Sequence, residues 1–486
     1  MSNVSPTIEN YPKPDNHKVF LFYPFYYTDK NQKYIENLPL RCIAEVLYPT
    51  DSFNISYAEK IWQKKEKVNL SNDLILKIQN IFNSNGSLNR NITQNTISYS
   101  ITAQCKNLLS GVLGKKGKGL EIDINKTAKK RLGIDSGISL FINDITLFIF
   151  GSGVCILLIE IMYPDADINT IIEGNYVAAR TSSFKQIHNL RIKEKDSKEF
   201  TFETLAKKLL SFISDKEYKI NLSRIFTYSA LSFKEALPKN RDFALKLARH
   251  YTSDYKVSAE ELKSGFIESF DTVLHYASLE GGTVIVENSN TAKALEGFIN
   301  DQVPNVYLPI VIVAYHEYLY LTKKLHFGVD VDVRHPDNKT VDEFKKYRDD
   351  ILNFRLNYHV THVSLISMHN DAYNVWREKF LLDKLYETLS ADVHEVTTYI
   401  STKIEEKRNS RWDTFSIIHA TIGIFFGTMI SMYSTVGVKF IELISGKNIT
   451  TTSDKIFLLK SLGLTLFAAL FIAAIYLFLV WRIKKK

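Results

Sequence analysis

Two long uncharged stretches near the end of the chain constrain its fold most strongly. Thr414–Val438 and Ser461–Trp481 contain no Asp, Glu, Lys or Arg. A helix needs about 20 apolar residues to cross the hydrocarbon core of a bilayer, and each stretch provides that length. The sequence therefore predicts two membrane-spanning helices, at residues 412–438 and 461–481. An external loop, 439–460, would join them, and a basic cytoplasmic tail, 482–486, would follow the second.

The beginning of the chain predicts that the part before these stretches stays in the cytoplasm. The opening sequence MSNVSPTIENYPKPDNHK is polar and has no apolar core, so we expect no signal peptide. Two spans would then place both termini in the cytoplasm and make the chain a multi-pass protein of the cytoplasmic (inner) membrane. The three cysteines, Cys42, Cys105 and Cys155, form no C-x-x-C motif, which fits a reducing compartment. The net charge of +8 is modest, and we expect no nucleic-acid partner.

Strand and helix patterns interleave in the first two thirds of the chain and predict an α/β or α+β domain. Residues 1–18 read as a disordered tail, and residues 19–305 as a cytoplasmic ligand-sensing domain. Apolar, β-branched or aromatic runs predict strands at Val19–Tyr27, Ile225–Phe233 and Gly282–Val286, and two strands joined by a glycine turn within Ile145–Met162. Helical periodicity predicts helices at Glu36–Leu47, Tyr57–Lys67, Asn69–Gly86, Phe243–Tyr251, Ala259–Ile267 and Thr291–Ile299.

Residues 306–411 have mainly helical patterns, starting with an amphipathic helix at Ile310–Leu325. A capping-box pattern at Thr340 and Glu343 predicts a second helical region that continues, with one break, to the first apolar stretch. We expect a stalk helix without interruption from about Asn370 to Val438, packed on its own domain or on the same helix of neighbouring subunits. The stalk has an apolar repeat of 11 residues, typical of a nearly straight packing seam. Its members are Leu382, Leu385, Leu389, Val393, Val396, Ile400 and Ile404.

Small residues follow one face of the first apolar stretch, with His419 beside them. They allow two interpretations: tight helix packing of the G-x-x-x-G type, or the lining of a pore. The predicted pore-lining residues are Ser416, His419, Ala420, Gly423, Gly427, Ser431 and Ser434.

Candidate ligand residues are basic. The loop Gly111–Gly119, GVLGKKGKG, offers Lys115, Lys116 and Lys118, but no Ser or Thr follows them as in a P-loop. Phosphate binding and an ordinary solvated loop both remain open for it, and Arg180 and Arg224 are further ligand candidates.

No metal site and no enzyme is predicted. Three histidines, His359, His362 and His369, fall close to one face of a predicted helix, yet no further ligand accompanies them, so packed or surface histidines are favoured over a metal site. The acidic turn Gly328–Asn338 lacks the glycine and final glutamate of an EF-hand. Because the sequence has no G-x-S-x-G, H-E-x-x-H or Walker A pattern, we expect no catalytic residues.

The overall layout, with a large α/β domain, a long stalk helix and a lysine-rich end, resembles the CorA family of metal-ion channels. The segment Glu405–Phe426, EEKRNSRWDTFSIIHATIGIFF, is similar to the junction between stalk and membrane in that family. The stretches ITLFIFGSGVCILLIEI and LPIVIVAYHEYLYL resemble segments of divergent members. The resemblance implies five subunits, a pore lined by the first span, and a Gly-Met-Asn signature at the outer pore mouth.

The chain departs from that signature. The matching stretch is Gly437-Val438-Lys439-Phe440, so valine replaces methionine and lysine replaces asparagine. A ring of lysine ammonium groups at a pore mouth would repel divalent cations, whereas a lysine directed outward would reach the lipid headgroups. Lys439 therefore argues against magnesium uptake in either orientation, because the asparagine amide is missing.

Divergent CorA-like proteins without the signature include membrane effectors of type III CRISPR defence. This resemblance implies an antiviral channel, opened when a nucleotide second messenger such as an S-adenosylmethionine–AMP conjugate binds the cytoplasmic domain. The expected partners are the lipid bilayer, further copies of the chain in a homopentamer, and that nucleotide. A divergent Mg/Co/Ni transporter, with a divalent cation as its cargo, and a membrane-anchored receptor without a pore are the alternatives.

Overall fold

A computed structural model describes residues 12–27, 33–48, 55, 58–83, 96–109, 120–124, 138–179, 188–192, 198–211, 225–252, 255–287, 295–327 and 338–444, with single positions beyond. The chain forms two compact units. The first comprises Met1–Gly328 and Arg348–Ala391, and the second comprises Val329–Tyr347 and Asp392–Lys486.

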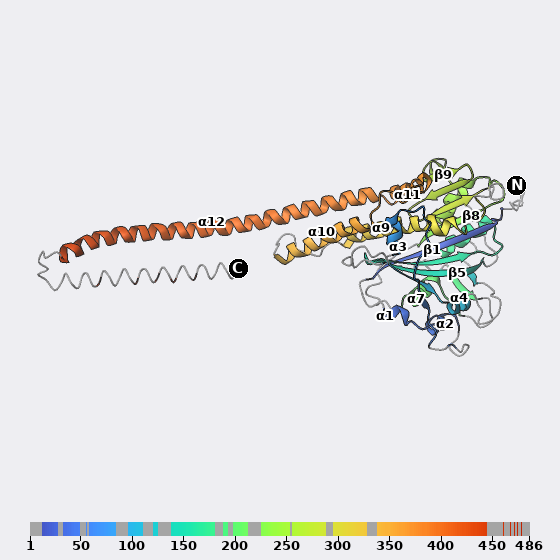
Figure 1. Cartoon of the computed structure of the whole chain (residues 1–486), viewed down its shortest axis with the longest axis horizontal. Helices are drawn as coiled ribbons and strands as arrows, with labels where there is room; N and C mark the ends of the chain where they lie inside the picture. Colours follow the sequence, from blue (N-terminus) through green and yellow to red (C-terminus); the bar gives the residue numbers. More distant parts are fainter. Residues whose placement is uncertain are drawn as a thin grey trace, which may run out of the picture. The chain divides into compact units, whose positions relative to one another are not determined.

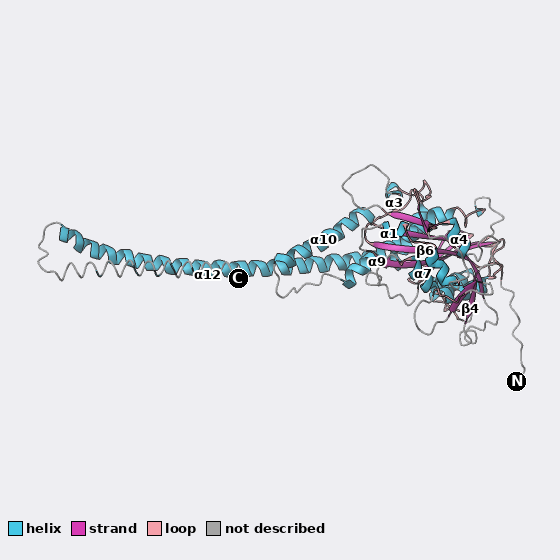
Figure 2. Ribbon diagram, turned by 90° about the horizontal axis from the view of Figure 1, so that it is seen from below, coloured by secondary structure: helices cyan, strands magenta, loops and turns pink. Residues whose placement is uncertain are grey.

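A mixed sheet of eleven described strands forms the centre of the first unit (Figures 1 and 2). Its main path runs in the order β2-β3-β5-β6-β1-β8-β11-β10-β9, so the first strand of the chain lies in the middle. Only β8 and β11 are parallel neighbours among the pairs described. The strands on this path are β1 (Asn16–Tyr26), β2 (Trp62–Lys64), β3 (Ile97–Ile101), β5 (Ile138–Ile149), β6 (Val154–Met162), β8 (Phe226–Ser232), β9 (Phe266–Phe270), β10 (Val273–Ala277) and β11 (Gly281–Val286). Two further strands, β4 (Leu120–Ile124) and β7 (His188–Ile192), extend from β5.

The residue types of these strands explain their position. β1 is rich in aromatic residues and is buried on both faces, as expected for a central strand. Its Pro24 lies beyond Phe22, the last β1 residue paired with β8, so the missing N–H of the proline costs no bond to that neighbour. β5 and β6 form a hairpin in which Gly153 has a φ of +80°. All five predicted strands are confirmed, including the two within Ile145–Met162.

Helices cover both faces of the sheet. Alternate side chains of β1 point to opposite faces. Val19 and Leu21 join a core with residues of α2, α4, α6, α7 and α8. On the other face Phe22 packs edge-on against Tyr315 of α9, with 5.8 Å between ring centroids. The helices of this unit are α1 (Lys33–Glu36), α2 (Arg41–Leu47), α3 (Leu76–Phe82), α4 (Ala103–Leu109), α6 (Ile168–Ala178), α7 (Phe202–Leu209), α8 (Asn240–Arg249), α9 (Leu308–Phe327) and α11 (Ser367–Lys379).

Several helix predictions are wrong or too long. Tyr57–Lys67 contains β2, and Ala259–Ile267 contains a 3₁₀ turn and the start of β9. In both cases pairing with a neighbouring strand overrides a weak local periodicity. The helix expected over Asn69–Gly86 is limited to α3, whereas Ile310–Leu325 is confirmed by α9. Thr291–Ile299 is partly outside the described residues, and the described part is a turn.

Two helices belong to both units: α10 (Asn338–Tyr358) and α12 (Leu382–Ile444). The predicted stalk is confirmed in α12, a continuous helix of 63 residues. All seven residues of its apolar repeat are buried or half-buried. The predicted start at Asn370 is wrong, because Leu381 has a φ of +53° and separates α11 from α12. Likewise Thr340 lies inside α10 rather than at its start.

The membrane prediction is overturned. In the part of the chain that the structure describes, no helix is both long enough and apolar enough to cross a membrane. The predicted CorA-like fold with two transmembrane helices is therefore corrected to a mixed α/β fold. The predicted multi-pass location in the cytoplasmic membrane is not supported either. Most of Ser461–Trp481 lies outside the described residues.

Candidate functional site

The predicted ligand residues are not part of the described structure. Lys115, Lys116, Lys118, Arg180 and Arg224 all lie outside the described residues. The acidic turn Gly328–Asn338 lies outside them as well, apart from its last residue. Among the described residues, no group of three or more His, Cys, Asp or Glu side chains is placed so that it could hold a metal ion.

The small-residue face of α12 is exposed as far as its side chains are described. Ser416, His419, Ala420, Gly423 and Gly427 are all exposed. A Cβ atom added at either glycine would have no neighbour within 4 Å. The remaining predicted pore residues are in the backbone of α12, with side chains outside the description: Ser431, Ser434, Gly437, Val438 and Lys439.

The three histidines do not share a helix face. His359 and His362 lie in the segment between α10 and α11, and His369 is in the first turn of α11. Nδ1 of His369 lies 3.0 Å from the hydroxyl of Ser364, whereas Nδ1 of His359 lies 2.6 Å from a carboxylate oxygen of Glu317. The helical spacing used in the prediction is therefore absent.

Glu317 is the most unusual of these partners, because its side chain is completely buried in α9. Besides His359, the hydroxyl of Tyr373 in α11 donates to its other oxygen at 3.4 Å. Tyr386, in the second turn of α12, faces the same carboxylate, and burial together with that negative charge raises the pKa of its hydroxyl. A buried carboxylate is tolerated only with such partners. Glu317 thus joins α9, α11 and the start of α12.

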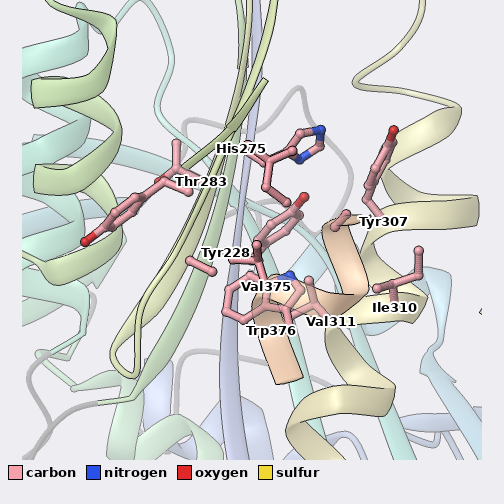
Figure 3. A pocket seen from close by; sticks show the side chains of 12 residues that line it. Tyr228, His275, Thr283, Tyr307, Ile310, Val311, Val375 and Trp376 are labelled. Atoms are coloured by element: carbon pink, nitrogen blue, oxygen red, sulfur yellow. The ribbon is translucent and has the colours of Figure 1, made fainter. Parts of the chain in front are cut away.

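A small cavity of about 10 Å³ lies in the same layer, between the sheet and α11 (Figure 3). His275 of β10, Tyr307 and Trp376 of α11 are among its lining residues, and the rings of His275 and Tyr307 pack together with their centroids 4.7 Å apart. Tyr307 also packs edge-on against His369, at 5.6 Å. Among the described residues, Nε2 of His275, Nε2 of His369 and the hydroxyl of Tyr307 have no hydrogen-bond partner. Burial lowers the pKa of His275 to about 3, so this imidazole is neutral at pH 7.

One serine–histidine pair in the fold resembles a catalytic arrangement. Oγ of Ser152, in the β5–β6 turn, lies 2.7 Å from Nε2 of His316 in α9. Burial lowers the pKa of His316 to about 3, and its ring stacks on Phe150 at 4.1 Å. Since a general base works best with a pKa near the working pH, we interpret the pair as a structural tie between hairpin and helix.

A larger, polar hollow opens on the surface of the first unit, with a volume of about 380 Å³. Two segments distant in sequence form it: the stretch before α3 and the turn that leads into α9. Its lining residues are Lys67, Asn69, Leu70, Ser71, Asn72, Asp301, Gln302, Asn305 and Val306. Asn305 is held in place by two hydrogen bonds. Its side-chain amide donates to the carboxylate of Asp301 at 2.8 Å, and its backbone carbonyl accepts from the backbone N–H of Ser71 at 3.0 Å. The hollow is therefore partly preorganised for polar contacts.

The wall of the hollow is an unusual helix. Val303–Tyr307 forms a π-helical turn, η3, that continues into α9. Such turns are rare and occur frequently at functional sites. Asn305, in the middle of the turn, faces the hollow, while Tyr307, at its end, lines the inner cavity. A single five-residue turn thus connects the hollow with the cavity against α11.

A second connection runs through the other wall of the hollow. The hydroxyl of Ser71 bonds to Asp73 at 2.9 Å. The carbonyl of Asp73 accepts from the hydroxyl of Ser364 at 2.8 Å, and Ser364 contacts His369 of α11. Further along, the ammonium of Lys77 donates to the carbonyl of His359 at 2.6 Å. Both segments that line the hollow are therefore connected to α11 through a short series of contacts. The chain passes from α11 to α12 through two residues, Phe380 and Leu381.

The comparisons add no family to this description: the chain matches no protein-family model, no curated protein and no solved structure. The resemblance to CorA channels consequently stays a prediction. Sequence reasoning missed both the hollow and the Glu317 cluster. One signal for the cluster was present, because His316 and Glu317 interrupt the otherwise apolar and aromatic run Leu308–Leu321 of α9.

Proposed function

We propose that this chain is a ligand-responsive, self-associating effector. Its α/β unit binds a small polar ligand in the hollow, and the response passes through η3 and α11 to the long helix α12. The proposal rests on the position of Asn305 and Tyr307 on one π-turn. Asn305 lines the hollow, and Tyr307 lines the inner cavity that residues of α11 also line.

The Glu317 cluster supports the relay. A buried charge has a few well-defined partner arrangements rather than a continuous range, which is the property required of a two-state element. Its partners Tyr373 and Tyr386 lie on either side of the break at Leu381, where α11 ends and α12 begins. A shift of α11 would therefore change the environment of the first turns of α12.

Exposed apolar side chains on α12 support self-association. Trp412 and Ile430, on the same side of α12 as Gly423, are each at least 60% exposed. Large exposed apolar surfaces usually mark contacts with another molecule. The uncovered Gly423 and its small neighbours would let a second copy of the helix approach closely, as in other small-residue helix pairs.

The oligomeric state of the full chain tests the proposal. We expect sedimentation velocity to show an oligomer, and Gly423→Leu to reduce its order or raise its dissociation constant. Thr421→Leu places the same side chain at an exposed position on the opposite side of α12 and is the matched control. A monomeric wild type, or equal effects of the two leucines, would refute self-association through this face.

A further inference from the structure

The charges around the hollow are unusual because they are opposite and not paired with each other. Lys67 and Asp301 both line the hollow, on its two different walls. Neither forms an ion pair with another described residue, whereas many exposed charges of this unit do, for example Arg241 with Glu268 at 2.7 Å. The site therefore offers one cationic and one anionic contact to a single bound molecule.

Carboxamides make up much of the remaining lining of the hollow. Asn69, Asn72, Gln302 and Asn305 contribute side chains that both donate and accept hydrogen bonds. Among the described lining residues there is no arginine for bidentate contact with a phosphate and no aromatic ring for stacking on a base. The lining consequently favours a molecule with a balanced charge and many polar groups over a polyanion.

The volume sets an upper limit on the size of that molecule. About 380 Å³ is within the range of sites for small molecules. It leaves room beyond a lone glycine or alanine for a polar extension that the carboxamides can contact.

We propose that the hollow binds a zwitterion of the dipeptide type, with its ammonium and carboxylate at opposite ends and a polar extension, made up of its peptide group and a polar side chain. Lys67 contacts its carboxylate, Asp301 contacts its ammonium group, and the four carboxamides contact the extension. This inference rests on the proposed function, since it names the ligand class of the same site. Asp301 remains anchored by Asn305, so occupancy of the hollow acts directly on the η3 turn.

A set of three related dipeptides tests the charges separately. The probes are L-alanyl-L-glutamine, its N-acetyl derivative without the ammonium, and its C-terminal amide without the carboxylate. Isothermal titration calorimetry with the full chain should show binding of the zwitterion and a loss of roughly tenfold or more in affinity for each neutralised form, as expected for one charge-assisted contact.

Two variants locate the binding. Asp301→Asn should lower the affinity for the zwitterion but leave the affinity for the N-acetyl form unchanged. Lys67→Gln should lower the affinity for the zwitterion but leave the affinity for the C-terminal amide unchanged. Asp271→Asn, an exposed aspartate outside the hollow, is the matched control and should change nothing. Equal affinities of the three probes, no binding of any, or an equal effect of Asp271→Asn would overturn the assignment.

The outcomes separate this inference from the proposed function. If adenosine monophosphate binds in an Asn305-dependent way while the dipeptides do not, the zwitterion assignment is overturned and a ligand-responsive function stands. If the dipeptide binds with the expected charge dependence but leaves the oligomeric state of the chain unchanged, the ligand class stands and the coupling to α12 is refuted.

Discussion

Removal of the partner of Glu317 gives the sharpest test of the buried cluster. His359→Leu leaves a carboxylate that is fully buried, with tyrosine hydroxyls as its remaining partners in the cluster. Removing the hydrogen-bond partner of a buried carboxyl group costs about 1–3 kcal/mol or more. Glu317→Leu should cost less, since Tyr373 keeps a second acceptor, the carbonyl of Val360 at 3.2 Å.

The double variant Glu317→Leu/His359→Leu should be more stable than the sum of the single effects predicts, by about 2 kcal/mol or more, because no unpaired charge is left buried. Urea unfolding of the four proteins, followed by tryptophan fluorescence and hydrogen exchange of α11, measures this coupling. Glu317→Gln, which keeps the shape of the side chain, controls for packing. Additivity of the two leucine substitutions to within about 0.5 kcal/mol would show that the pair is not coupled and would refute the relay argument.

Three further predictions concern packing and acid stability. Gly282→Ala should destabilise the first unit by about 1–3 kcal/mol, because the new Cβ would lie 2.4 Å from the ring of Trp376; an unchanged urea midpoint would contradict this. Gly153→Ala should cost about 1–2 kcal/mol through its φ of +80°, measurable as a lower melting temperature. Stability should decrease below about pH 6.5, by about 1.4 kcal/mol per pH unit for each buried histidine whose pKa burial lowers, because the unfolded chain then binds the proton that the folded chain excludes. Equilibrium unfolding between pH 7.5 and 5 should show this slope, which the matching Phe variants would reduce; a flat profile would contradict it. These histidines are His17, with a pKa of about 4, and His275 and His316, with pKa values of about 3.

The sequence predicted the elements that depend on local residue types. The aromatic composition of β1 and the glycine turn of the β5–β6 hairpin are visible within a dozen residues, and the apolar repeat of α12 within about two dozen. Prediction fails where contact with a residue far away in the sequence determines the secondary structure. Tyr57–Lys67 has a helical pattern, yet Trp62 pairs with Ile101, a residue almost forty positions away.

The candidate site was harder to predict for the same reason. The hollow brings together Ser71 and Asn305, which are more than two hundred residues apart, and no local motif marks either segment. Glu317 finds His359 at a separation of 42 residues. The basic loops attracted attention because lysines and glycines form recognisable local patterns, whereas carboxamides in turns are common and carry no such signal.

The central place of β1 in the sheet has a consequence for synthesis. Its two neighbours are β6 and β8, so its hydrogen bonds are complete only after Ser232 has been made, about 200 residues later. At translation rates of about 5–20 residues per second, this strand waits roughly 10–40 s without a full set of partners. An apolar strand with unpaired edges is prone to aggregate. We therefore expect the newly made chain to depend on chaperones that shield β1, and its folding to be slow, as is typical of sheets closed by distant strands.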